Sequence, residues 1–180
     1  NDDSVYYYLQ KVAAQKDLEF STKLPIIFSV YKDKVDTDTA TFVKFFNILN
    51  ILSVTNENQC EVWSLLNTGY MRQGNMEKAT LTAKKSINLG CNEYQLYKNL
   101  LYSSSITEKP DSVIVIAKQA IELFPSEPLP YLFAGVNSLY DKDYNSCISY
   151  LNDGLKYVGS EKDLLEDFYS NIGESYYRIG

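Results

Sequence analysis

The sequence predicts an all-α protein, a solenoid of antiparallel helix pairs with about ten helices. Two observations lead to this prediction. Apolar residues recur every three or four positions, as in Trp63, Leu66 and Tyr70, which is the spacing of one face of an amphipathic helix. From residue 60 onward, the helical segments also align with one another at a fixed period of 34 residues. Strand-like alternation of apolar and polar residues is missing.

The first 59 residues predict helices that do not follow the repeat. They cover about residues 3–15, 21–33 and 38–54. Ser21 or Thr22 is expected to cap the second helix, with Pro25 in its first turn. Residues 1–59 are therefore predicted to form an N-terminal segment that packs on the array, and its last two helices are compatible with a degenerate repeat.

The third of these helices carries an aromatic stripe at helical spacing. Phe42, Phe45 and Phe46 lie on one face of it. Such a stripe is far more often core than a ligand site, so we expect it to pack against Trp63 and Leu66.

The repeat itself covers the rest of the chain. Residues 60–93, 94–127 and 128–161 align without gaps, and after an insertion at 162–165 the first helix of a further, truncated repeat is expected at 166–180. The fourth position of each unit is aromatic, namely Trp63, Tyr97, Tyr131 and Tyr169. Position 27 is small, namely Ser86, Ala120 and Gly154. Small residues at fixed positions let neighbouring helices approach closely, which a stack of helix pairs requires.

This pattern resembles the tetratricopeptide repeat (TPR) family, whose 34-residue helix–turn–helix units carry an aromatic residue or Leu at position 4 and small residues at positions 8, 20 and 27. Gly135 fits position 8 and is expected to lie where the two helices of its pair nearly touch, whereas Asn67 and Leu101 depart from the family pattern there. The resemblance covers residues 60–180. It implies a right-handed superhelix in which the first helix of each pair lines a concave groove.

Catalytic chemistry is not predicted. The chain has no histidine, so neither a Ser-His nor a Cys-His nucleophile pair can form. A Gly-rich phosphate loop is also missing. Carboxylates such as Asp141 and Asp143 lie at predicted turns, where they are expected to cap helices. We therefore predict no enzyme activity, no cofactor and no metal site.

The three cysteines do not follow a recognisable pattern. Cys60, Cys91 and Cys147 are an odd number, and their spacing fits neither a metal knuckle nor an evident disulfide framework. They are expected to be buried, inert thiols. The cellular compartment stays open.

Charge and hydropathy narrow the class of partner. The formal net charge of −6, with scattered Lys and Arg, argues against nucleic-acid binding. No apolar run is long enough for membrane insertion, and the start Asn-Asp-Asp lacks the features of a signal peptide. Since an initiator Met is missing and the chain stops at Tyr-Tyr-Arg-Ile-Gly, both ends are expected to be cut from a longer protein.

The resemblance implies a protein or peptide partner held in the groove. The predicted contact residues are Lys98, Tyr102, Leu132, Val136 and Tyr140. The groove positions of the third unit are almost wholly apolar, which indicates either a docking surface for an amphipathic helix or apolar peptide, or a surface that neighbouring helices cover. The predicted function is an interaction scaffold. The alternative is a regulatory or assembly segment of a longer multidomain protein whose effector domain lies outside this chain.

Overall fold

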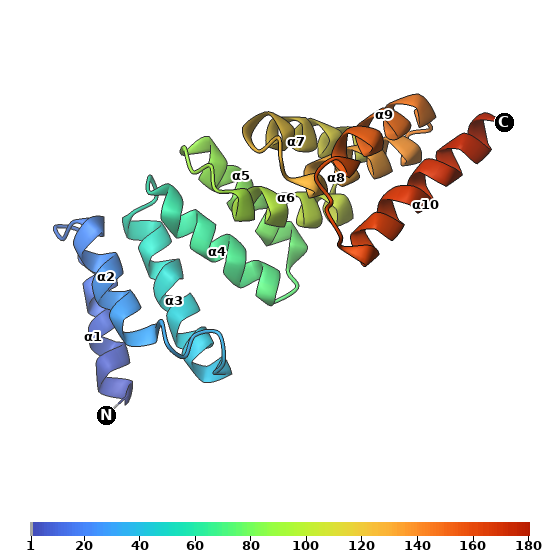
Figure 1. Ribbon diagram of the computed structural model, residues 1–180. Coiled ribbons are helices and arrows are strands. Elements are labelled where there is room, and N and C mark those ends of the chain that lie inside the picture. The colour runs from blue at the N-terminus through green and yellow to red at the C-terminus, as the bar shows by residue number, and fades with distance from the viewer. Residues whose placement is uncertain (1) are drawn as a thin grey trace. The chain divides into compact units, whose positions relative to one another are not determined.

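The computed structural model describes residues 2–180, and within them it contains ten α-helices and no β-strand (Figure 1). The predicted all-α class is therefore confirmed. The chain divides into two compact units, Asn1–Gly74 with Leu81–Cys91, and Asn75–Thr80 with Asn92–Gly180.

The first unit is built from the N-terminal helices. These are α1 (Asp2–Ala14), α2 (Phe20–Tyr31), α3 (Thr39–Thr55), α4 (Cys60–Arg72) and the C-terminal part of α5 (Met76–Asn88). Helix α3 packs against α1, α2 and α4. Its aromatic stripe is buried as expected, and Trp63 and Leu66 of α4 belong to the same apolar cluster.

Helix α2 begins one residue earlier than predicted. Phe20 is buried and forms its first residue, and the backbone of Glu19 occupies the N-cap position. Ser21 and Thr22 therefore lie inside the first turn, so the expected cap is wrong. Pro25 lies one turn further along, inside the helix, so its expected place in the first turn is also wrong.

Two other carboxylates do cap helices. Asp38 accepts a hydrogen bond from the backbone N–H of Thr41 at 2.8 Å, and Asp143 accepts one from that of Ser146 at 3.1 Å. Hydrogen bonds from the side chains of Thr41 and Ser146, followed by these backbone hydrogen bonds, stabilise the ionised form and lower the pKa of both carboxyl groups. Asp143 thus has the capping role that was expected of it.

The second unit contains the remaining helices. After the first residues of α5 come α6 (Tyr94–Thr107), α7 (Pro110–Leu123), α8 (Pro128–Tyr140), α9 (Tyr144–Leu155) and α10 (Lys162–Ile179). Each of α6 to α9 packs on the next helix, and α6, α8 and α10 also contact one another in order. This pattern is that of a solenoid, in which the first helices of successive pairs lie side by side.

Close helix contacts in this unit depend on glycine. A Cβ atom added to Gly135 would lie 2.6 Å from the side chain of Leu151 and 3.3 Å from the carbonyl oxygen of Cys147. The expected near contact between α8 and α9 is therefore confirmed. Each of the three predicted units contains one helix pair, namely α4 with α5, α6 with α7, and α8 with α9. The division of the chain into repeats itself stays a prediction. Residues 162–165, interpreted as an insertion, form the first turn of α10.

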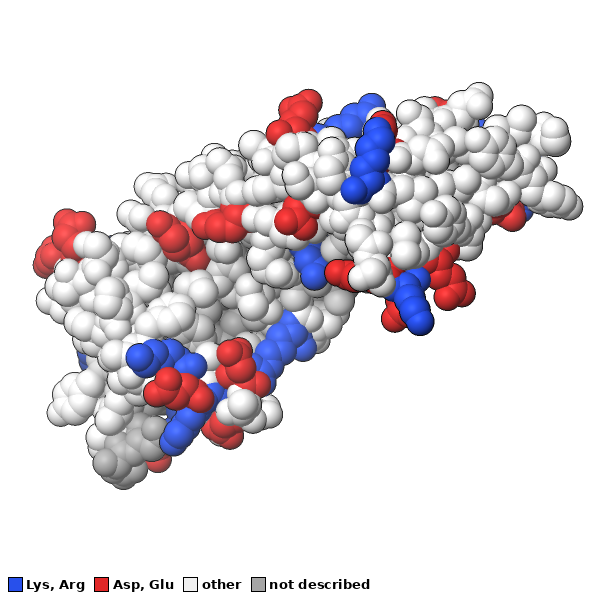
Figure 2. Space-filling view, viewed as in Figure 1, with Lys and Arg blue, Asp and Glu red and all other residues white. Residues whose placement is uncertain are grey.

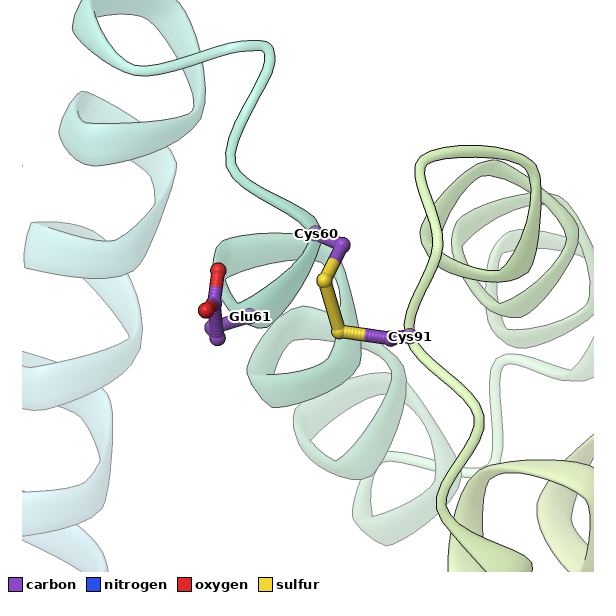
Figure 3. Close-up of side chains that lie close together, drawn as sticks. All are labelled: Cys60, Glu61 and Cys91. Atoms are coloured by element: carbon purple, nitrogen blue, oxygen red, sulfur yellow. A yellow bond between two sulfur atoms is a disulfide. The ribbon is translucent and has the colours of Figure 1, made fainter.

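Two of the three cysteines form a disulfide, so the expectation of three free thiols is wrong. Cys60 and Cys91 are joined at 2.07 Å between the sulfurs and 5.6 Å between the Cα atoms (Figure 3). Cys60 starts α4 and Cys91 follows α5, and an antiparallel helix pair brings these two points together. Spacing alone did not reveal this. Cys147 is free and buried as expected, and its burial raises the pKa of its thiol.

Candidate functional site

A pocket of about 570 Å³ lies in the second unit, beside the helices that line the predicted groove. We call it the tyrosine–acid pocket. Its lining residues are Tyr94, Lys98, Tyr102, Ser126, Glu127, Pro128, Leu129, Tyr157, Val158, Glu161, Asp163, Leu164 and Asp167. They come from α6, from the start of α8 with the connection before it, and from the start of α10 with the connection before it.

Helix α6 contributes one face to the pocket. Tyr94, Lys98 and Tyr102 are spaced by four residues, so they follow one another along the same side of the helix. The Tyr102 ring packs edge-on against Phe133 of α8, with 5.0 Å between ring centroids, and the Tyr94 ring packs against Phe124 at 5.5 Å. These contacts fix the orientation of both rings.

Acidic groups dominate the charge of the pocket. Glu127, Glu161, Asp163 and Asp167 face a single cation, Lys98. Among the residues that the structure describes, neither this lysine nor the last three carboxylates form an ion pair. Glu161 occupies the N-cap position of α10 without using its side chain as a cap. The carboxylates are therefore available to a cationic group from outside.

Glu127 acts on the neighbouring Tyr94 phenol. Burial of the phenol, followed by the charge of Glu127 and a side-chain hydrogen bond to it, raises the pKa of Tyr94. The phenol therefore stays protonated at neutral pH. Tyrosine ring faces attract cations, which adds to the effect of the carboxylates.

The structure separates the five predicted contact residues. Lys98 and Tyr102 line the tyrosine–acid pocket, and the Tyr102 side chain is 43% exposed. Tyr140 is 73% exposed and lines a different pocket of about 290 Å³. Leu132 and Val136 are half-buried on α8, and Leu132 packs against the apolar cluster around Tyr131 and Phe168. The apolar stripe is thus partly covered.

Sequence reasoning missed most of the acidic side of the pocket. Glu127, Glu161 and Asp163 lie next to helix starts, where carboxylates ordinarily cap or complement the helix dipole. Tyr94 precedes the predicted Lys98 and Tyr102 at the same four-residue spacing, and this spacing was a signal that could have added Tyr94 to the α6 face. On the face drawn in Figure 2, basic and acidic residues are interspersed.

A second cluster of polar groups lies in the first unit. The ligand atoms of Cys60, Glu61 and Cys91 lie within 4.8 Å of one another (Figure 3). Because a thiolate is the metal-binding form of cysteine, the disulfide leaves only the Glu61 carboxylate as a ligand. No metal site is assigned there. Within residues 2–180, no helix is both long and apolar enough to cross a bilayer.

Comparison with known proteins gives the fold. No protein-family model and no curated protein sequence matches the chain. A crystal structure of MamA superimposes with a TM-score of 0.72 at 19% identity, covering 85% of this chain and 80% of MamA. YrrB, a TPR protein with an unusual peptide-binding site, superimposes with a TM-score of 0.65 at 12% identity, covering 85% of this chain and 83% of YrrB. The TPR2AB domain of yeast Sti1, in a complex with pHSP90, superimposes with a TM-score of 0.54 at 15% identity, covering 87% of this chain and 64% of the Sti1 chain. The chain has the fold of TPR proteins, as the repeat pattern predicted.

Proposed function

We propose that this chain is a non-catalytic interaction scaffold that holds a partner peptide in the groove lined by α6, α8 and α10. The contact residues are Lys98, Tyr102, Leu132, Val136 and Tyr140. The observation that supports the proposal is the tyrosine–acid pocket, whose lining comes from α6 and from the starts of α8 and α10 and includes Lys98 and Tyr102. Two proteins with the same fold support it, since YrrB has a peptide-binding site and the Sti1 domain forms a complex with pHSP90.

The charge of the pocket selects the class of peptide. Four carboxylates and three tyrosine rings complement a Lys or Arg side chain through ion pairs and cation–π contacts. The half-buried Leu132 and Val136 complement apolar side chains next to the basic ones. The proposed partner is therefore a peptide that carries both basic and apolar residues, and nucleic acid and bilayers are not proposed as partners.

Fluorescence anisotropy with two labelled peptides tests this proposal. The probes are an acetylated hexapeptide that alternates Leu with Lys, and its counterpart that alternates Leu with Glu. We expect the basic peptide to bind with a Kd in the micromolar range, on the order of 10–100 μM, and to weaken as salt screens the pocket. Equal affinity for the two peptides would contradict the proposal.

Matched charge variants locate the binding site. Asp163→Asn with Asp167→Asn removes two carboxylates from the pocket, and we expect roughly tenfold weaker binding. The control is Asp111→Asn with Glu122→Gln, which removes the same charge from exposed positions of α7. Asp111 and Asp163 both occupy the first turn of a helix, so the loss of these two charges affects the interaction with the helix dipole alike. Equal losses in both double variants would mean that only net charge matters.

A further inference from the structure

A separate apolar pocket of about 250 Å³ lies in the first unit between α2, α3 and α4. Its walls are formed by Phe28, Phe42, Phe45, Phe46, Leu49 and Leu65. We call it the phenylalanine pocket. None of these residues belongs to the groove of α6, α8 and α10, so ligand binding in this pocket is independent of the proposed function.

The walls of this pocket hold one another in place. Phe28 packs edge-on against Phe45 at 5.3 Å between centroids, and Phe42 stacks on Phe46 at 5.7 Å. Phe46 also abuts Gly69 of α4, where a Cβ atom would clash with the ring. Because the rings are braced in this way, the pocket is preformed. An apolar group that enters it gains dispersion contacts and removes apolar surface from water.

Charged groups surround the mouth of the pocket. Lys32, Arg72 and Asp36 also line it, so two cations face one carboxylate. The Arg72 guanidinium lies 4.2 Å from the centroid of the Phe42 ring and donates a hydrogen bond to the backbone oxygen of Val35 at 2.6 Å. That bond fixes the guanidinium while leaving further N–H donors, because the group has five.

The second cation has no partner of its own. In the described part of the chain, the Lys32 ammonium forms neither a hydrogen bond nor an ion pair. An aromatic cavity with one anchored and one unengaged cation at its mouth is complementary to a molecule with an apolar body and an anionic end.

We infer that the phenylalanine pocket binds a small carboxylic acid with an aromatic or branched apolar body. The body occupies the space between the phenyl rings, and the carboxylate lies at Lys32 and Arg72. The volume suits a group of about one ring, since pockets for drug-sized ligands begin at roughly 300 Å³. The same chemistry occurs in a free acid and at a peptide end with a terminal Phe, and the experiment separates these two sources.

Heteronuclear NMR titration of the whole chain tests the inference. The probe is hydrocinnamate, and its matched controls are hydrocinnamide, which lacks the charge, and propionate, which lacks the ring. We expect hydrocinnamate to bind with a Kd on the order of 1 mM or tighter and to shift the amide signals of α3 and α4, including that of Gly69. Both controls should bind at least about fivefold more weakly. Equal binding of the amide, or shifts confined to residues outside α2, α3, α4 and the connection at 32–38, would overturn the inference.

Two variants and one control check the contacts. Lys32→Gln should weaken hydrocinnamate binding roughly fivefold, whereas Lys34→Gln removes the same charge outside the pocket lining and should change nothing. Thr68→Phe places a ring in the pocket from an exposed position of α4 and should abolish binding with helicity unchanged. Unaltered affinity in both Lys32→Gln and Thr68→Phe would overturn the site.

A tripeptide resolves the source of the carboxylate. Acetyl-Gly-Gly-Phe with a free terminus is compared with hydrocinnamate on the same protein. Tighter binding of the tripeptide assigns the pocket to a peptide end, and tighter binding of hydrocinnamate assigns it to a free acid. If neither binds, the inference is wrong.

Discussion

Two glycines show how single residues control the helix packing. Gly135 and Gly173 occupy the same position in successive predicted units. A Cβ at Gly135 meets Leu151 at 2.6 Å, whereas a Cβ at Gly173 meets nothing within 4 Å. The same residue type at the same register thus has a packing role in α8 and none in α10.

Substitution of these glycines should therefore have different effects. Gly135→Leu overpacks the contact with α9, and we expect it to lower the free energy of unfolding by about 1–3 kcal/mol. Gly173→Leu adds a side chain at an open helical position and should leave stability equal or slightly higher. Urea unfolding followed by circular dichroism measures both. An unchanged midpoint for Gly135→Leu would mean that α8 and α9 are not in close contact.

Buried Lys23 shows where residue-level prediction fails. Its ammonium donates to the side chain of Asn56 at 2.9 Å and approaches the backbone oxygen of Ala13 at 3.5 Å. Burial lowers the pKa of this lysine. Helical periodicity located α2 and its apolar face, but the polar partners of Lys23 come from distant parts of the chain. A local pattern carries no information about such partners.

Helix α8 shows the same limit for a whole element. Its bounds follow from the break residues on either side and from its apolar spacing, both of which are local. Whether its apolar stripe is open or covered depends on contacts with other helices, among them α10. The half-buried state of Leu132 and Val136 lies between the two alternatives that the sequence left open.

Two polar substitutions along α8 measure this coverage. Leu132→Glu puts a charge against the apolar cluster around Tyr131, so we expect a loss of about 1–3 kcal/mol in the free energy of unfolding. Tyr140→Ser, at a position 73% exposed, should stay within about 0.5 kcal/mol. Thermal unfolding of both variants measures these changes in stability. If Leu132→Glu is as stable as the unsubstituted protein, the stripe is open surface.

Across the whole molecule, repetition is what made the fold predictable. Aromatic residues such as Trp63 and Tyr97 recur at one position of a 34-residue period, and each unit repeats the same local chemistry. The tyrosine–acid pocket was only half predictable, since Lys98 and Tyr102 follow from the helix face. Glu127 and Glu161 reach it from two separate connections. Cysteine spacing alone did not predict the disulfide, because the pairing depends on how the helix pair α4 and α5 brings Cys60 next to Cys91.

The disulfide affects the stability of the folded chain as a whole. It closes a loop between residues 31 positions apart, and this restricts the unfolded chain. We expect its loss to lower the free energy of unfolding by about 2–4 kcal/mol. Trp63 is the single tryptophan and lies three residues after Cys60, with the Lys85 ammonium 3.7 Å from its ring centroid. Its fluorescence therefore reports unfolding near the disulfide.

A reductant tests this prediction, and the control is a variant that lacks the two disulfide cysteines. Dithiothreitol should lower the urea midpoint of the unsubstituted protein and leave that of Cys60→Ser with Cys91→Ser unchanged, since this variant has no disulfide to lose. Cys147 is present in both proteins, so its free thiol cannot account for a difference. Mass spectrometry of protein alkylated without prior reduction provides a second check. Alkylation of all three cysteines would contradict the disulfide, and packing alone would then hold α4 against α5.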